Sequence, residues 1–303
     1  MLMTTVNPER YAAAHKTAVY THRPLGVLNI SGKTRLDLLH RMSTQKLNGL
    51  QSGQGAATIL TTDIGRSIDR LLVYVNDDTI QVLTGENNGN AIASYLRRFV
   101  FYNDDFHMQD VSAETAVLHI YGAQASHLFG VPTLPLHHWQ AVTLAGAMAT
   151  LHRTDPVTGD GVMLLCETAV LPPISAHLHE IGIHAADEAT FDYLRIESGL
   201  PRFGYEISQE YIPLETNLWD DISFNTGCYI GQEIIARMDS RGKVAKTVHR
   251  FTPATPANIG DKIMADGKKV GSITSAANGP AGAMAMGYVK TAVLEAKTPL
   301  TIK

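Results

Sequence analysis

Runs and alternations of apolar residues predict strands and helices in the first part of the chain. Segments with the short apolar runs typical of strands are 25–30, 53–62, 68–75 and 79–84. Helical spacing of apolar residues is present in 36–42 and 90–100. The turn sequence Asn76-Asp77-Asp78 joins two of the strands directly, which favours antiparallel pairing. Residues 1–112 are therefore expected to form an α+β domain.

The middle of the chain continues this mixture. Strand-like pieces are 116–121, 140–152 and 161–166, and helical patterns are 124–129, 174–181 and 186–198. The last helix is expected to stop at Gly199-Leu200-Pro201, because glycine and proline end helices. The pattern predicts a smaller α/β sandwich over 113–185.

The pattern of apolar and turn residues changes beyond Gly242. Short strand-like runs at 247–251, 262–265 and 269–274 alternate with Gly, Pro and Asp-Gly turns. Asp266-Gly267 between apolar runs predicts a β-hairpin. We expect 243–303 to form a small antiparallel β-barrel, which leaves 186–242 as a central segment of helices and loops.

Composition narrows the classes of protein. A chain of 303 residues exceeds the size at which one core stops growing, so two or three domains are expected. Hydrophobic residues make up 45% and charged residues 18%, which is typical of a folded globular protein. The formal net charge is -4 and no run of basic residues stands out, which argues against nucleic acid as a direct ligand.

Cysteine usage and hydropathy indicate the compartment. The two cysteines, Cys166 and Cys228, form no CxxC pair, so a disulfide framework is not expected. The first twenty residues lack the apolar core of a signal peptide, and no apolar stretch reaches the length of a membrane span. We expect a cytoplasmic protein without a membrane partner.

Two motifs resemble known sites but have the wrong spacing. Five residues separate Gly26 from Gly32-Lys33-Thr34, where a phosphate-binding loop needs four. His179 and His184 are five positions apart, where a zinc-protease helix needs four to place both imidazoles on one face. We interpret the first as a strand-to-helix turn and the second as polar histidines, and we expect no metal site.

Residues 193–241 are the segment in which we expect a functional site. This stretch is dense in glycine, proline and carboxylates, and long irregular segments inside a compact protein are more often functional than not. Residue spacing alone predicts a site built on loops and no particular reaction.

A resemblance to a known family makes the prediction specific. The sequence GCYIGQE at 227–233 resembles the K-G-C-[YF]-x-G-Q-E motif of the YgfZ-type folate-binding proteins, which are relatives of the aminomethyltransferases (glycine-cleavage T-proteins). The blocks 194–201 and 211–218, and the segments 27–42 and 65–74, are similar to the same family in order and spacing. The resemblance implies an aminomethyltransferase-like fold that binds tetrahydrofolate or a one-carbon derivative. It also implies a role with iron-sulfur proteins or their assembly machinery.

Two positions depart from the family pattern. Thr226 stands where the motif has a lysine, so the role of that positive charge does not carry over. Arg70 follows Asp69 where aminomethyltransferases carry a pair of acidic residues, which makes full aminomethyl transfer less expected.

The resemblance implies roles for residues that would hold a folate. Glu197 matches the glutamate that clasps the pterin ring, although a helix-end glutamate is also common in solvent. Asp69 is expected near the reactive nitrogens of the folate. Tyr74 and Tyr229 are candidates for aromatic walls or for core packing. Three arginines are unranked options for the anionic tail: Arg195, Arg237 and Arg241.

Cys228 is the candidate reactive group of the motif. It precedes a helix that Gly231 and Gln232 are expected to open, and a thiol near a helix N-terminus can have a lowered pKa. Buried cysteines are otherwise small hydrophobic residues. The resemblance implies that this cysteine is central to iron-sulfur cluster assembly or repair. Gln232 and Glu233 could either hold the loop or contact the ligand.

Three functions remain open from the sequence. The first is a tetrahydrofolate-binding accessory protein for iron-sulfur cluster assembly or repair, using Cys228. The second is a tetrahydrofolate-dependent one-carbon transferase with Asp69 beside the folate nitrogen. The third is a non-catalytic interaction module that has lost folate binding.

Overall fold

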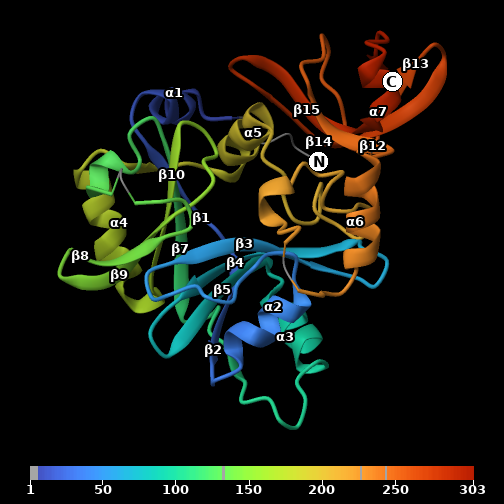
Figure 1. The fold of residues 1–303 in the computed structure, drawn as a ribbon. Coiled ribbons are helices and arrows are strands. Elements are labelled where there is room, and N and C mark those ends of the chain that lie inside the picture. Colours follow the sequence, from blue (N-terminus) through green and yellow to red (C-terminus); the bar gives the residue numbers. More distant parts are fainter. Residues whose placement is uncertain (1–5, 132–133, 226, 243) are drawn as a thin grey trace.

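The computed structural model describes residues 6–131, 134–225, 227–242 and 244–303, and it contains three sheets with helices between and around them (Figure 1). The helices are α1 Pro8–Lys16, α2 Arg35–Met42, α3 Gly89–Arg97, α4 Leu171–Glu180, α5 Glu188–Ser198, α6 Gln232–Arg241 and α7 Thr291–Glu295. Short 3-10 turns are His127–Phe129, Thr168–Val170 and Trp219–Asp221. In the described part of the chain, no helix is long and apolar enough to cross a membrane.

The first sheet has the strand order β3-β4-β5-β2-β6, and all its pairings are antiparallel. Its strands are β2 Leu25–Ser31, β3 Gly55–Thr61, β4 Ser67–Val75, β5 Thr79–Glu86 and β6 His107–Asp110. Helices α2 and α3 cover one face and bury a core of aliphatic residues against it (Figure 1). The four strands and two helices predicted in this region are confirmed.

The second sheet has the order β11-β1-β7-β10-β9-β8. Its strands are β1 Val19–His22, β7 Thr115–Gly122, β8 Trp139–Leu144, β9 Ala147–Arg153, β10 Asp160–Glu167 and β11 His184–Ala185. Helix α4 packs on its outer face (Figure 1). Strand β1 comes from the first twenty-odd residues of the chain and pairs antiparallel with β7 and parallel with β11.

The inner faces of these two sheets pack against each other. Their shared core contains Val27, Leu72 and Leu83 from the first sheet and Val117 and Leu165 from the second. These two sheets and their helices therefore stack in the order helices, sheet, sheet and helix, with one apolar layer between the sheets.

Helix α5 links the packed sheets to the C-terminal part. Asp187 caps its first turn by accepting from the Thr190 amide, and Gly199 ends it with a φ of 80°. Figure 1 shows α5 between the second sheet and the C-terminal sheet, and its residues contact β14 and β15. Helix α5 can therefore present side chains to both the second sheet and the C-terminal sheet.

The C-terminal strands form a five-stranded antiparallel sheet in the order β12-β15-β14-β13-β16. Its strands are β12 Lys246–Phe251, β13 Lys262–Ala265, β14 Lys268–Gly279, β15 Gly282–Lys290 and β16 Thr301–Ile302. Asp266 and Gly267 form the predicted hairpin turn with φ values of 49° and 75°. The antiparallel sheet is confirmed, and its closure into a barrel stays a prediction.

Two local predictions were wrong, and two elements near the start of the chain were not predicted. Segment 140–152 is a hairpin of β8 and β9 that turns at Ala145 and Gly146, where φ is 50° and 77°. Segment 124–129 contains a 3-10 turn and no α-helix. The residues before 25 form α1 and β1, and the Asn7 side chain caps the first turn of α1.

Candidate functional site

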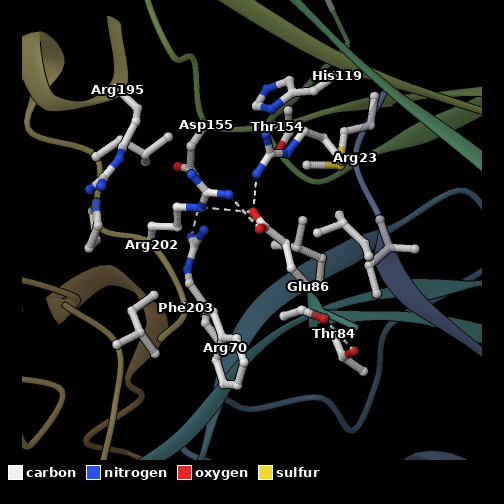
Figure 2. Close-up of a pocket in the computed structure, with 18 of the residues that line it drawn as sticks. Arg23, Arg70, Thr84, Glu86, His119, Thr154, Asp155, Arg195, Arg202 and Phe203 are labelled. Carbon is white, nitrogen blue, oxygen red and sulfur yellow. Dashed lines mark hydrogen bonds and ion pairs between the residues drawn. The ribbon is translucent and has the colours of Figure 1, made fainter. Parts of the chain in front are cut away.

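A cavity lies where the two packed sheets meet α5 and the segment 200–207 (Figure 2). Its volume is about 120 Å³. A cavity of roughly 150 Å³ takes up one benzene molecule, so this cavity is no larger than a single small ring requires. Its apolar walls come from Leu25, Leu72, Leu83, Met163, Phe191, Leu200, Pro201, Phe203 and Ile207. Apolar walls with a few fixed polar groups are typical of small-molecule sites.

Phe203 forms part of the wall because residue 85 has no side chain. A β-carbon on Gly85 would lie 2.7 Å from Phe203 Cδ1, closer than carbon atoms pack. The Gly85 amide also donates to Asp69 Oδ2 over 2.8 Å. Glycine near the end of β5 thus lets an aromatic ring and a buried carboxylate approach the same backbone.

Asp69 on β4 is a buried carboxyl group in the cavity wall. Its Oδ1 accepts from the Arg70 amide at 2.8 Å, and its Oδ2 accepts from the Gly85 amide and from Asn88 Nδ2, both at 2.8 Å. Burial raises the pKa of Asp69 to about 6, although these three hydrogen bonds lower it. The group can therefore hold or release a proton close to neutral pH.

Glu86 lies between two arginines on the polar side of the cavity (Figure 2). Arg202 donates to both carboxylate oxygens, over 3.0 Å from Nε and 2.6 Å from Nη2, and Arg23 pairs with the same carboxylate. Burial alone would raise the pKa of Glu86, but the hydrogen bond from Arg202 and the charge of Arg23 hold it below its ordinary value. Glu188 pairs with both arginines as well.

Arg70 holds a second group of charges together. Its Nε is 2.6 Å from Asp221 Oδ2, and its Nη2 is 2.7 Å from Asp155 Oδ2. Burial alone would lower the pKa of Arg70, but the two carboxylates raise it above its ordinary value. Arg70 and Asp155 also line a second cavity of about 450 Å³, so their ion pair lies between the two cavities.

Of the residues predicted for the site, Asp69 and Arg195 line the cavity. Arg195 is buried, and each of its three side-chain nitrogens has a partner. Nε contacts Asp192 at 2.7 Å, Nη1 contacts Glu206 at 2.7 Å and Nη2 donates to Ser275 at 2.6 Å. This arginine fixes α5 to the central segment and to the C-terminal sheet, and its role with a folate tail stays a prediction.

Glu197, Tyr74 and Tyr229 are not among the residues that line the cavity. Glu197 accepts from the Tyr11 hydroxyl at 2.9 Å and lies 3.3 Å from His15 Nε2, so it faces α1. It is two residues from Arg195, and positions with that separation lie on different sides of a helix. The contacts of Glu197, Tyr74 and Tyr229 with a folate stay predictions.

The two tyrosines are buried in separate cores. Tyr74 packs between the sheets, where burial raises its pKa and its hydroxyl has no hydrogen-bond partner among the described residues. Tyr229 packs with Ile235 in the core under α6, and burial raises its pKa to about 12.

The GCYIGQE loop packs against the turn between β3 and β4. Thr61 donates its hydroxyl to the Ile230 carbonyl, and a β-carbon on Gly231 would lie 2.5 Å from the Thr62 carbonyl oxygen. Gln232 Nε2 donates to the Gly227 carbonyl over 3.3 Å, which indicates a loop-holding role. The loop thus contacts the hairpin that carries Asp69.

Cys228 is exposed and free, and it does not line the cavity. Arg237 is also exposed and pairs with Glu233 at 3.2 Å, one turn away on α6. Thr226 and the side chain of Arg241 lie outside what the structure describes. Among the described residues, no group of three or more His, Cys, Asp or Glu is placed to hold a metal ion.

Sequence reasoning missed four charged residues of the cavity: Arg23, Glu86, Asp155 and Arg202. Arg202 directly follows Leu200-Pro201, so extending the block 194–201 by one residue would have included it. The other three follow or end strands β1, β5 and β9, and only the tertiary structure brings these strand ends together.

Comparison with known proteins gives one family. The model of the GCVT N-terminal domain matches residues 2–226. A candidate chloroplastic transferase of Arabidopsis thaliana is 27% identical over 273 residues, which cover 88% of this chain and 63% of that protein. The chain thus spans less than two thirds of that relative's length.

Bacterial relatives and a solved structure agree with this match. The aminomethyltransferases of Halalkalibacterium halodurans and Thermus thermophilus are 24% and 25% identical, over 91% of this chain and 79% and 80% of theirs. The crystal structure of glycine cleavage system aminomethyltransferase T from Bartonella henselae superposes with a TM-score of 0.80 at 18% identity, over 96% of this chain and 84% of that one. The fold is therefore aminomethyltransferase-like, with helices, sheets and a C-terminal antiparallel sheet.

Proposed function

The chain belongs to the GCVT N-terminal domain family, and from this premise we propose that its cavity binds the pterin ring of a tetrahydrofolate. The observation that carries the proposal is the buried carboxyl group of Asp69 beside the apolar walls of the cavity. A pterin presents flat apolar faces and ring N-H groups, so it needs such a combination. A cavity of about 120 Å³ can enclose at most part of the two-ring pterin, so the rest of the folate and its tail would lie outside it.

The acceptors in the cavity have capacity for a ligand. Asp69 Oδ1 accepts one hydrogen bond, from the Arg70 amide, and a carboxylate oxygen can accept two. The ion pair of Asp155 with Arg70 uses its Oδ2. Bound folate supplies the nitrogens that carry a one-carbon group, and Asp69 would hold or accept a proton beside them.

Calorimetric titration with tetrahydrofolate tests this assignment. We expect binding by the wild type, binding weakened about ten-fold by Asp69→Asn because a charge-assisted hydrogen bond is lost, and unchanged binding by Glu197→Gln, which lies outside the cavity. No binding by the wild type would sink the folate proposal. Loss of binding in Glu197→Gln alone would move the site away from this cavity.

Within the family, we propose that the chain is of the YgfZ type and supports iron-sulfur cluster assembly or repair in the cytoplasm. The GCYIGQE sequence and the exposed thiol of Cys228 support this proposal. Contact of the loop with the turn before Asp69 gives a path by which a bound folate could affect the thiol. The clients would be iron-sulfur proteins or their assembly machinery.

The role of the thiol is tested in cells in which a Cys228→Ala variant replaces the wild type. We expect the activities of iron-sulfur enzymes to fall relative to the wild type. Cys166→Ala is the matched control, because Cys166 is buried in the second sheet and should leave those activities unchanged. Equal activities in both variants would contradict the proposed role of Cys228.

A folate-dependent one-carbon transferase is the second candidate. The raised pKa of Asp69 favours it, because a group that titrates near neutral pH can exchange a proton with a folate nitrogen. Arg70 counts against it, since this position holds an ion pair with Asp155 and Asp221 in place of a second free carboxylate. Formation of a one-carbon-substituted tetrahydrofolate, with release of the amine, when the purified protein is given tetrahydrofolate and an aminomethyl donor would favour the transferase.

A further inference from the structure

His119 on β7 is a cavity residue that the proposed folate contacts leave unused. It is 4% exposed, it lines the cavity, and its Nε2 has no hydrogen-bond partner in the described part of the chain. A buried nitrogen without a partner is unfavourable, because it has lost its hydrogen bonds to water. Such an atom in a cavity wall points to a ligand that completes it.

The hydrogen bonding of His119 determines what its free nitrogen can do. The backbone of Asp155 accepts a hydrogen bond from the imidazole, and Nδ1 is the nitrogen left for that bond. Burial and the charge of Arg23 lower the pKa of His119 to about 3, so the ring is neutral. With its proton on Nδ1, a neutral imidazole presents a lone pair at Nε2, which makes this atom an acceptor.

Neighbouring groups do not supply the missing donor. Arg23 directs its two terminal nitrogens to Glu86 and Glu188. The rings beside His119 belong to Tyr121 and Phe191, with centroids 5.6 Å and 6.1 Å away. The Tyr121 hydroxyl is paired with Thr21. A ligand in the cavity that His119 lines is a source of the donor that Nε2 lacks.

We infer that His119 Nε2 is a specificity-determining acceptor for a ring N-H of a reduced pterin, an inference that rests on the proposed binding of folate. A carboxylate suits the paired donors of an aminopyrimidine edge, whereas a single neutral acceptor suits a single ring N-H. A fully oxidised pterin has bare nitrogens in its second ring, and a lone pair there would face the lone pair of Nε2. The cavity should therefore prefer reduced over oxidised folate.

Calorimetric titrations with tetrahydrofolate and folic acid test this preference. We expect the wild type to bind tetrahydrofolate at least about ten-fold more tightly than folic acid. Tetrahydrofolate would donate a hydrogen bond to His119 Nε2, whereas folic acid would leave that acceptor unpaired. His119→Leu should bring the ratio close to one, mainly by weakening tetrahydrofolate binding. His119→Gln, whose amide oxygen is again an acceptor, should restore part of the preference.

The matched control is His152→Leu. His152 is equally buried and its pKa is also lowered to about 3, but it does not line the cavity. Its variant should keep the wild-type ratio even if it is less stable. Equal affinities of the wild type for both folates, or a preference that persists in His119→Leu, would overturn the inference and leave folate binding intact. Absence of binding for both folates would instead overturn the proposed function itself.

Discussion

Arg70 connects three segments that are far apart in the sequence. It lies on β4, Asp155 follows β9 and Asp221 ends a 3-10 turn of the central segment, and the ion pairs are 2.6 and 2.7 Å long. Removing the cation would leave Asp221 buried and Asp155 partly buried without a counter-charge. A buried charge that loses its partner destabilises a protein far more than the intact pair stabilises it.

We therefore expect Arg70→Met to lower the free energy of unfolding by about 3–5 kcal/mol. Urea denaturation followed by circular dichroism measures this change. Adding Asp155→Asn and Asp221→Asn to the variant should recover much of the loss, because the uncompensated charges are then gone. Arg237→Met is the control: it breaks an exposed pair with Glu233 and should cost less than about 1 kcal/mol.

At the scale of residues, the sequence predicted the cavity only in part. Asp69 and Arg195 were identified because they lie in blocks that resemble a known family, and both line the cavity. Glu86 and Asp155 belong to no recognisable motif, and their roles depend on arginines that meet them only in the folded chain. Isolated charged residues carry no local signal of this kind of pairing.

At the scale of elements, the end of β5 leaves no room for an added side chain in the cavity wall. The Phe203 ring packs on the Gly85 backbone, which leaves no room for a β-carbon. Gly85→Ala should displace Phe203 and weaken tetrahydrofolate binding at least about ten-fold in calorimetry. Gly271→Ala serves as the control, since it collides with the Tyr288 carbonyl in the C-terminal sheet and should destabilise the protein without changing affinity. Similar losses of affinity in both variants would contradict this prediction.

Elements with strong periodic patterns were predicted, and those with weak patterns were missed. The strands of the first sheet are rich in aliphatic residues, which makes their signal clear. Helix α1 buries only Ala14, so its sequence shows little apolar periodicity. Strand β15 is composed largely of Ala, Gly and Met, residues without the β-branching that marks strands. The hairpin of β8 and β9 was hidden because alanine occupies its first left-handed position.

At the scale of the whole molecule, buried histidines between the sheets make stability depend on pH. Burial lowers the pKa of His119 and of His152 from 6.5 to about 3. Below pH 6.5 the unfolded chain therefore binds protons that the folded chain does not, so the free energy of unfolding decreases as the pH falls. Each histidine lowers the free energy of unfolding by up to about 1.4 kcal/mol for each unit that the pH falls below 6.5. Asp69 offsets part of this loss, because its folded pKa of about 6 lies above the unfolded value of 3.8.

Urea denaturation between pH 7 and pH 5 measures this dependence. We expect stability to fall over that range, and we expect the fall to be smaller by about one histidine's contribution in His152→Leu. His127→Gln removes an exposed histidine and should leave the slope unchanged. A wild-type stability that stays constant or rises toward pH 5 would refute the neutral, buried state of these rings.

The pairing of β1 has a consequence for how the protein is made. Val19 is synthesised well before either of its partners, Tyr121 and His184. At roughly 5–20 residues per second, a ribosome needs on the order of ten seconds to deliver the first of these partners and longer for the second. During that interval the nascent strand has open edges that another chain could occupy. Completion of the second sheet is thus timed by translation, and a chain released before residue 184 would lack the strand that closes this edge.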